Sequence, residues 1–457
     1  MKDFDLNFVR RHFYAFDADN PLSEKAFFEN AGGSFPCKFV VDKLTKFYQT
    51  TKVQPYGYFN GSIEAGEEMD NSCKKIAQLL RVPLKNLHVG PSTSQNTYVL
   101  ANALRLSKNK KKVIIVSNQD HESNTGVWRN LASQGFEVRE WKVRSNGSLY
   151  LDDLKKLVDK TVCLIAFPHA SNIIGQVNPV KDICTIAKEA GAFTCVDGVS
   201  YAPHGIPQIN DFSPDIYLFS SYKTFGPHLG VMYVSDSLAT ELESQCHYFN
   251  QEFPNKRFTP AGPDHAQVAA LGGIYDYYDA LSDHHLNSKL SSSSSIDKVN
   301  NLVDSSGIKV EVYDKEWLEE NNFGAVLGVG KGSERPPYFL VGKYNPDAKY
   351  QIALIGKGVL FDSGGYSLKS PSGMETMKTD MSGAASAWGV INLVARTNQK
   401  IGLTVYTPIV ENMVSGSAIR PGDVLKTRNG KTIEVMNTDA EGRLIMADAL
   451  AFASEAK

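Results

Sequence analysis

The sequence of 457 residues predicts an α/β protein built from two α/β sandwich domains. Short, apolar, β-branched runs alternate with helical patterns between residues 85 and 234, and a similar alternation begins again at Ile308. This alternation is typical of sheets that helices cover on both faces. Between the two regions lie five consecutive serines, Ser291–Ser295. They offer no apolar side chain to bury, so they predict a flexible connection, with an exposed loop inside one domain as the alternative.

The composition narrows the class of protein. A hydrophobic content of 42% is sufficient for sizeable cores, and the length suggests two or three domains. The formal net charge of −2 gives no electrostatic reason to expect nucleic acid or an anionic membrane as a partner. No run approaches the roughly eighteen apolar residues of a membrane span, and the charged N-terminus lacks a signal-peptide core. Six cysteines without CxxC spacing predict buried free thiols, so we expect a cytoplasmic protein.

The first region predicts a mainly parallel sheet. Helical patterns cover residues 93–106, 180–190 and 238–244, and runs that are typical of strands alternate with them. Sheets of this kind bind ligands at the carboxyl ends of their strands. The predicted strands are Lys112–Val116, Val162–Phe167, Ala192–Val196, Ile216–Phe219 and Gly230–Val234.

Polar residues stand at the expected strand ends. The hydroxyls of Ser92, Thr93 and Ser94 precede a helix, where hydroxyls and backbone amides suit a phosphate. Asp197 and Lys223 each end a strand. Taken singly, these features are also explained by a helix cap, a turn and a solvated charge. Taken together, they indicate a cofactor site.

At these residues the sequence resembles the class V aminotransferase and cysteine desulfurase family, whose members have fold type I and use pyridoxal phosphate (PLP). The resemblance runs from the N-terminus to about Asn287. It rests on the segments Glu29–Gly33, Asp120–Asn124, Pro168–Asn172, Asp197–Ser200 and Ser220–Lys223.

The resemblance implies a role for each polar residue. Lys223 would form the Schiff base with the cofactor, Asp197 would pair with the pyridine nitrogen, and His121 would stack on the ring. Amines form imines with aldehydes, and a carboxylate keeps the pyridine nitrogen protonated. The remaining contacts, to the phosphate and the ring hydroxyl, would come from Thr93, Ser94, Ser220, Tyr222 and Asn172.

The second region predicts strands at Lys309–Tyr313, Tyr338–Gly342 and Tyr350–Ile355, with a helix at Glu316–Asn321. Charged residues then accumulate in an otherwise apolar frame, and a second charged group follows a predicted strand at Thr432–Val435. Carboxylates that converge repel one another unless cations compensate them, which is the property of hard-oxygen metal sites. Two such ions would polarise a carbonyl and lower the pKa of water, as amide hydrolysis requires. The charged residues are Lys357, Asp362, Lys369, Asp380, Asp439, Glu441 and Arg443.

Asp439 and Glu441 alternate, so in extended backbone they would project to one side. The alternative is a turn followed by a helix N-terminus, where acidic residues are favourable. Their segment, Asn437–Leu444, resembles the signature of the leucyl aminopeptidase (cytosol aminopeptidase) family, and the resemblance covers Ile308 to Lys457. It implies that Lys369 stabilises an oxyanion and that Arg443 holds a bicarbonate. Two divalent ions, zinc or manganese, would be bound by Lys357, Asp362, Asp380, Asp439 and Glu441.

We expect a PLP domain at residues 1–287, a serine-rich junction at 288–295, a remnant of the aminopeptidase N-terminal domain at 296–349 and its catalytic domain at 350–457. The resemblances imply that both domains are truncated and that the chain is a homo-oligomer. The leading hypothesis is a dimetal aminopeptidase that acts on peptides, fused to a PLP-binding domain. A PLP enzyme acting on a small amino acid (an aminotransferase, desulfurase or lyase) and an inactive fusion are the alternatives.

Overall fold

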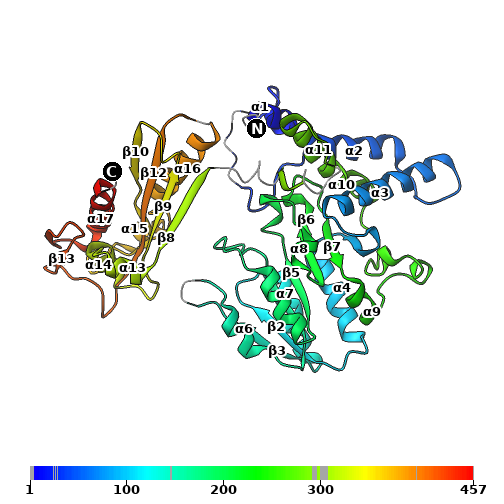
Figure 1. Ribbon diagram of the computed structural model, residues 1–457, viewed down its shortest axis with the longest axis horizontal. Coiled ribbons are helices and arrows are strands. Elements are labelled where there is room, and N and C mark those ends of the chain that lie inside the picture. Colours follow the sequence, from blue (N-terminus) through cyan, green and yellow to red (C-terminus); the bar gives the residue numbers. More distant parts are fainter. Residues whose placement is uncertain are drawn as a thin grey trace. The chain divides into compact units, whose positions relative to one another are not determined.

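The computed structural model describes residues 5–23, 25, 27, 29–144, 147–290, 296–298, 307–397 and 399–455. The chain divides into two compact units, Met1–Asp304 and Ser305–Lys457 (Figure 1). The predicted junction Ser291–Ser295 lies outside the described residues. All six cysteines are free, and four of them are buried. Among the helices that the structure describes, none combines the length and apolarity needed to cross a membrane.

Unit 1 contains a seven-stranded mixed sheet in the order β1-β7-β6-β5-β4-β2-β3. The strands from β6 to β3 run parallel to one another, whereas β7 runs antiparallel to both β1 and β6. The strands are β1 (Leu87–Gly90), β2 (Val113–Ser117), β3 (Glu137–Trp141), β4 (Val162–Pro168), β5 (Phe193–Asp197), β6 (Ile216–Ser220) and β7 (Gly230–Val234).

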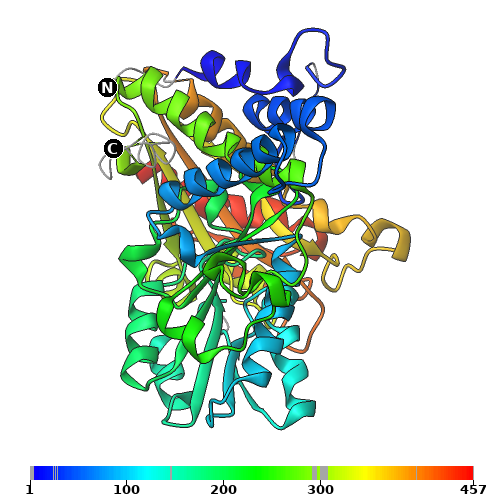
Figure 2. The same cartoon turned by 90° about the vertical axis from the view of Figure 1, so that its right-hand side faces the viewer.

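Alternating side chains supply a separate core on each face of this sheet. Ile115 of β2 belongs to one core and Ile114 to the other, because neighbouring strand residues point to opposite faces. Helix α7 (Val180–Glu189) contributes to the first core, whereas α4 (Thr93–Leu106) contributes to the second. In Figure 2 helices flank the strands of unit 1 on both sides.

A group of helices packs together beyond one end of the unit 1 sheet (Figure 1). Helix α10 (His265–Leu271) contacts both α2 (Lys38–Lys46) and α3 (Asn60–Leu79). Helix α11 (Gly273–Leu286) follows α10 directly and also packs against α2. The first helix, α1 (Leu6–Arg11), joins this group because Phe8 stacks on His284 of α11 at 3.8 Å between ring centroids.

Unit 2 is organised around one long strand, β12 (Gly402–Asn412). Strands β10 (Gln351–Ile355) and β11 (Gly358–Asp362) pair parallel with its first and second halves. On its other side β12 pairs antiparallel with β9 (Tyr338–Tyr344), and β9 pairs with β8 (Ile308–Tyr313). The sheet is therefore mixed, and Asp362 stands at the carboxyl end of β11 beside the end of β12.

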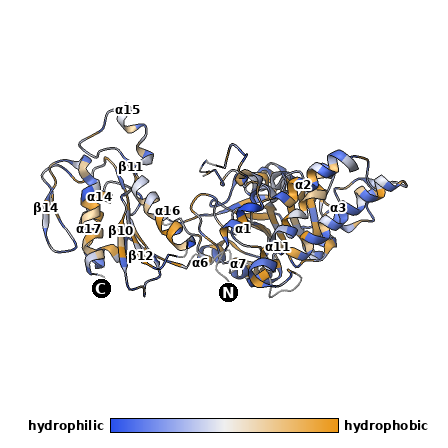
Figure 3. Cartoon of the chain, turned by 90° about the horizontal axis from the view of Figure 1, so that it is seen from above, coloured by the Kyte–Doolittle hydropathy of each residue, from blue (hydrophilic) through white to orange (hydrophobic). Residues whose placement is uncertain are grey.

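Helices cover both faces of this sheet (Figure 1). Helices α14 (Gly324–Gly330) and α17 (Glu441–Glu455) supply the larger core, and α16 (Ser382–Arg396) packs on the opposite face. The shorter elements are α13 (Lys315–Glu320), α15 (Pro371–Met374) and the hairpin of β13 (Val424–Lys426) with β14 (Thr432–Glu434). Figure 3 shows apolar residues concentrated in the strands and hydrophilic ones in outlying loops such as that beside β14.

The predicted strands and helices are confirmed to within a few residues. Five described strands were not predicted: β1, β3, β11, β12 and β13. One local expectation is wrong. Asp439 lies in a 3₁₀ turn, η11 (Thr438–Ala440), and Glu441 begins α17, so the backbone here is not extended. A helix start places acidic side chains near the positive end of the helix dipole, which explains why the turn and helix form instead.

Candidate functional site

A cavity of about 280 Å³ lies at the carboxyl edge of the unit 1 sheet. Its wall comes from the N-terminus of α4, the loops after β2 and β4, the end of β5 and the segment after β6. The structure brings together all eight residues that the sequence predicted for the cofactor: Thr93, Ser94, His121, Asn172, Asp197, Ser220, Tyr222 and Lys223.

Hydroxyl groups gather at one end of this cavity. Ser92 caps α4, with its Oγ accepting a hydrogen bond from Gln95 N at 3.1 Å. Thr93 Oγ1 lies 2.8 Å from Ser220 Oγ, which joins the start of α4 to the end of β6. A Cβ on Gly230 would stand 2.3 Å from the backbone of Ser92, so only glycine permits this approach. Free amides and hydroxyls at a helix N-terminus suit an anion.

The opposite side of the cavity is formed by Asp197, which is 4% exposed at the end of β5. Its Oδ1 accepts a hydrogen bond from Val199 N at 2.8 Å. Burial raises the pKa of Asp197, and this effect is opposed by the Val199 bond and by the electrostatic interactions with His121 and Lys223. The carboxylate therefore shares the cavity with the Lys223 side chain and the His121 ring.

Local contacts hold the histidine and the lysine. His121 Nδ1 accepts a hydrogen bond from Ser123 N at 3.1 Å, which places the ring proton on Nε2. The Ser123 hydroxyl also lies within hydrogen-bond distance of Nδ1. Lys223 ends the 3₁₀ turn η7 (Ser221–Lys223). Ser34 clamps this turn, because its N donates to Tyr222 O at 3.0 Å and its Oγ accepts from Phe225 N at 2.8 Å. The N-terminal segment therefore positions the lysine.

Two further cavity residues were missed by sequence reasoning. Asp120 precedes His121, and His228 stacks on Tyr222 with parallel rings 4.7 Å apart. Asp120 stands inside the segment Asp120–Asn124, and His228 lies between Lys223 and β7, so their position in the chain was the available signal.

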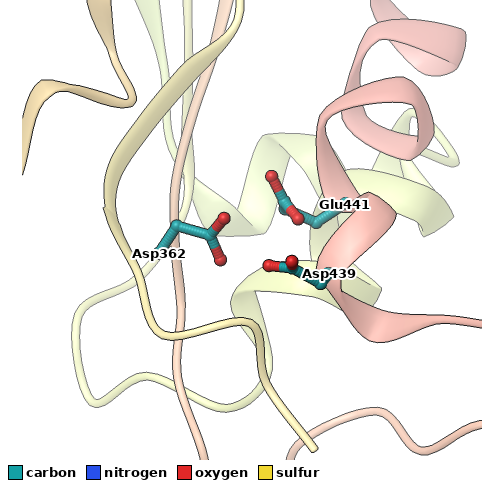
Figure 4. A group of neighbouring side chains, drawn as sticks. All are labelled: Asp362, Asp439 and Glu441. Carbon is teal, nitrogen blue, oxygen red and sulfur yellow. The ribbon is translucent and has the colours of Figure 1, made fainter. Parts of the chain in front are cut away.

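The predicted metal ligands of unit 2 also converge. Oxygens of Asp362, Asp439 and Glu441 all lie within 4.8 Å of one another. Figure 4 shows the three carboxylates facing each other, Asp362 from the end of β11, Asp439 from the turn η11 and Glu441 from the start of α17. The turn and the helix start thus bring the Asp439 and Glu441 carboxylates together, as the expected extended backbone would also have done.

Two lysines pair with these acids. Lys357 Nζ lies 2.7 Å from both Asp380 Oδ2 and Glu441 Oε1. Lys369 Nζ lies 2.9 Å from Asp362 Oδ2 and also pairs with Asp439. Burial lowers the pKa of each lysine, but the paired carboxylates raise it more, so the pKa of both is raised overall. Six of the seven predicted residues therefore form one cluster.

The surrounding backbone explains why the acids hold their places. Asp362 Oδ1 accepts hydrogen bonds from Gly364 N and from Asn412 Nδ2, both at 2.8 Å. Gly364 has φ of +85°, which only glycine adopts easily, and a Cβ there would lie 2.4 Å from Ser367 O. A Cβ on Gly442 would lie 2.8 Å from Lys357 Cδ, so this glycine makes room for the lysine.

The seventh predicted residue, Arg443, is exposed on α17. Among the described residues no ion pair joins Arg443 to the cluster. The buried atom Glu441 Oε2 has no hydrogen-bond partner. A buried carboxylate oxygen without a partner is costly unless a cation binds it, and hard oxygen donors favour divalent ions.

Comparisons with known proteins find different matches for the two parts of the chain. Residues 283–457 match the family model described as cytosol aminopeptidase family, catalytic domain. A probable cytosol aminopeptidase of Streptomyces griseus is 50% identical over 152 residues, and one of Chlorobium limicola is 52% identical over 151. Each alignment covers 33% of this chain and 30% of the relative, so the chain spans less than a third of these proteins.

Unit 1 has solved structural neighbours. A cysteine desulfurase of Thermococcus onnurineus aligns with a TM-score of 0.55 at 23% identity, covering 61% of this chain and 72% of that one. At this identity the likeness shows the fold. Residues 26–282, more than half of the chain, match the family model described as aminotransferase class-V. The chain therefore belongs to the class V aminotransferase family, and its residues 283–457 match, in addition, the model of the cytosol aminopeptidase catalytic domain.

Proposed function

We propose that the chain is a metal-dependent aminopeptidase that removes N-terminal residues from peptides. The observation that carries the proposal is the cluster of Asp362, Asp439 and Glu441, whose oxygens lie within 4.8 Å of one another. The unpartnered buried oxygen Glu441 Oε2 supports it, because a divalent cation would satisfy that atom. The match of residues 283–457 to the cytosol aminopeptidase family supports the reaction class.

Each residue then has a task. Asp362, Asp439 and Glu441, with Asp380, would hold two divalent ions, zinc or manganese, and Lys357 would join them as a neutral amine once the incoming cations displace its proton. Bound there, the ions would supply positive charge that polarises a peptide carbonyl and lowers the pKa of water. Lys369 lies among the acids and places an ammonium group where negative charge develops on the carbonyl oxygen. For Arg443 we propose the bicarbonate site.

The test is hydrolysis of a leucine amide by the full chain with manganese or zinc added. We expect activity in the wild type and a loss of roughly 100-fold or more in Asp439→Asn, which removes a charged ligand and keeps its shape. The matched control is Glu434→Gln, which changes an exposed acid of β14. A metal-replete wild type without activity would contradict the peptidase proposal and favour an inactive fusion.

A second function is favoured by a separate observation, the cavity of unit 1 that gathers all eight predicted cofactor residues. We propose that it binds PLP, with the phosphate at Ser92, Thr93, Ser94 and Ser220. The fit rests on hydroxyls at a helix N-terminus for the phosphate and on a lysine and a buried acid within one cavity. PLP would supply an aldehyde and an electron-accepting ring for reactions of a small amino acid.

In this second site the chain's own groups orient the cofactor. Asp197 would place a carboxylate at the pyridine nitrogen, His121 would stack on the ring, and Lys223 would hold the aldehyde. The test is the visible absorbance band of PLP-loaded protein after removal of free cofactor. We expect the band in the wild type and in Lys160→Ala, an exposed lysine control, and its loss in Lys223→Ala. A wild type that retains no PLP would contradict this assignment.

A further inference from the structure

The cofactor cavity contains a second carboxyl group that the roles above leave unused. Asp120 follows β2, and Asp197 ends β5, so both stand at the carboxyl edge of the sheet with only β4 between their strands. Both line the same cavity of about 280 Å³. Two carboxyl groups in one small cavity cannot both carry charge without strong repulsion.

Asp120 is fixed by two hydrogen-bond donors. Its Oδ1 accepts from His121 N and its Oδ2 accepts from Asn124 Nδ2, both at 2.7 Å. Asn124 is wholly buried, and its own Oδ1 accepts from Trp128 Nε1 at 3.0 Å and from Cys195 Sγ at 3.3 Å. Cys195 lies two residues before Asp197. The network therefore ties the His121 loop and α5 (Gly126–Arg129) to the strand that carries Asp197.

The charges in the cavity favour different protonation states for the two acids. Burial raises the pKa of Asp120 well above its ordinary value, and the charge of Asp197 raises it further. Burial also raises the pKa of Asp197, but His121 and Lys223 oppose this. The other titratable neighbour is Cys195, whose pKa is raised by burial and by both acids, so it stays neutral. These interactions favour the ionised form at Asp197 over the ionised form at Asp120.

We propose that Asp120 is a positioning residue of the cofactor site, which stays protonated and holds the His121 loop over the cavity while Asp197 carries the charge. The proposal rests on the PLP site proposed above. Asp120 acts through His121 and Asn124, because its two oxygens accept hydrogen bonds from the His121 backbone amide and the Asn124 side-chain amide. Its neutrality keeps one negative charge, rather than two, beside the ring-binding space.

The experiment compares three variants of the full chain. The Asp120→Asn side chain keeps the shape but carries no ionisable proton. One acceptor oxygen becomes an amide NH2 donor, which then faces the donor that bonded to that oxygen. Asp120→Glu keeps an ionisable carboxyl but moves it by one methylene. Asp152→Asn is the matched control, because Asp152 is 80% exposed on α6 (Leu151–Leu157) of the same unit. Circular dichroism checks the fold of each.

Two readouts separate protonation from positioning. The first is the infrared carbonyl band of a neutral carboxylic acid, measured at pH 7 on protein without cofactor. We expect the band in the wild type, Asp120→Glu and Asp152→Asn, and a loss of one carboxyl's intensity in Asp120→Asn. The second is the dissociation constant for PLP, which we expect to rise about tenfold or more in both Asp120 variants and to stay within about twofold in the control.

The outcomes are distinct. An infrared spectrum of Asp120→Asn that equals the wild type contradicts a protonated Asp120, and an unchanged PLP affinity in either Asp120 variant contradicts the positioning role. Should Asp120→Asn fail to fold, Asp120→Glu decides through its PLP affinity. A wild type that binds no PLP overturns the cofactor proposal itself, and the positioning role with it, whereas binding by the wild type with no effect of Asp120 overturns only the present inference.

Discussion

Glu441 Oε1 lies 2.7 Å from Lys357 Nζ, whereas its second oxygen, Oε2, is buried without a hydrogen-bond partner. One carboxylate oxygen is neutralised by the Lys357 ammonium group, and the other oxygen has no compensating charge. Burial raises the pKa of Glu441, and the nearby charge of Asp362 adds to this effect, so the group gains from any cation that reaches it.

Metal binding is therefore expected to stabilise unit 2. A ligand present at about 100 times its dissociation constant stabilises the folded state by about 2.7 kcal/mol. We expect manganese or zinc to raise the unit 2 transition in calorimetry, and a chelator to reverse the shift. In Glu441→Gln the shift should shrink markedly, whereas Glu434→Gln, an exposed acid, should keep it. Equal shifts in the two variants would contradict binding at Glu441.

Gly442→Ala provides a test of the space around Lys357. Alanine favours a helix over glycine by roughly 1 kcal/mol, but here its Cβ would lie 2.8 Å from Lys357 Cδ and 2.9 Å from Cε. We expect the flexible lysine to move away from Asp380 and Glu441, so metal affinity falls about tenfold or more while the fold persists. The metal affinity of the variant is measured by titration calorimetry.

The matched control is Gly389→Ala, also inside a helix, where an added Cβ would meet nothing within 4 Å. It should raise the stability of unit 2 by about 0.5–1 kcal/mol and leave metal binding unchanged. If Gly442→Ala binds metal as Gly389→Ala does, Lys357 does not take part in the site.

The bond between Thr93 Oγ1 and Ser220 Oγ, at 2.8 Å, predicts coupling between the start of α4 and the end of β6. Thr93→Val and Ser220→Ala each remove one hydroxyl from the anion end of the cavity, and each should weaken PLP binding about tenfold. Because the two hydroxyls bond each other, the double variant should lose less than the product of the single losses. Strictly multiplicative losses, measured by fluorescence titration, would mean that the hydroxyls act independently.

His169 predicts a loss of stability in acid. It is buried, its Nδ1 lies 2.7 Å from the Tyr217 hydroxyl, and burial lowers its pKa to about 3. In the unfolded chain the pKa of histidine is about 6.5, so as pH falls below that value the unfolded state binds a proton that the folded state does not. The free energy of unfolding of unit 1 should therefore decrease by up to about 1.4 kcal/mol per pH unit down to the folded pKa.

The check is calorimetry between pH 4 and pH 7. His169→Gln should show a shallower decrease with falling pH than the wild type, by about one proton, and the exposed His204→Gln should not. If the free energy of unfolding of His169→Gln fell with pH as steeply as that of the wild type, His169 would not remain neutral in the folded chain.

Sequence reasoning identified most members of both clusters because their chemistry is carried by short segments. Asp439 and Glu441 were found from the segment Asn437–Leu444, although their backbone was expected to be extended and is a turn and helix start. Asp120 and His228 were missed. Their environment comes from β5, α5 and the β6–β7 turn, and contacts between distant segments leave no local pattern.

The sequence by itself determined the α/β class, the resemblance to two families and the residue types of both clusters, because side-chain periodicity and short motifs are local properties. Only the tertiary structure decided how charge is shared inside each cluster. Lys357 and Lys369 pair with four acids in unit 2, and Asp120 and Asp197 line the same cavity. Burial and distance set the cost of a charge, and both exist only once the chain has folded.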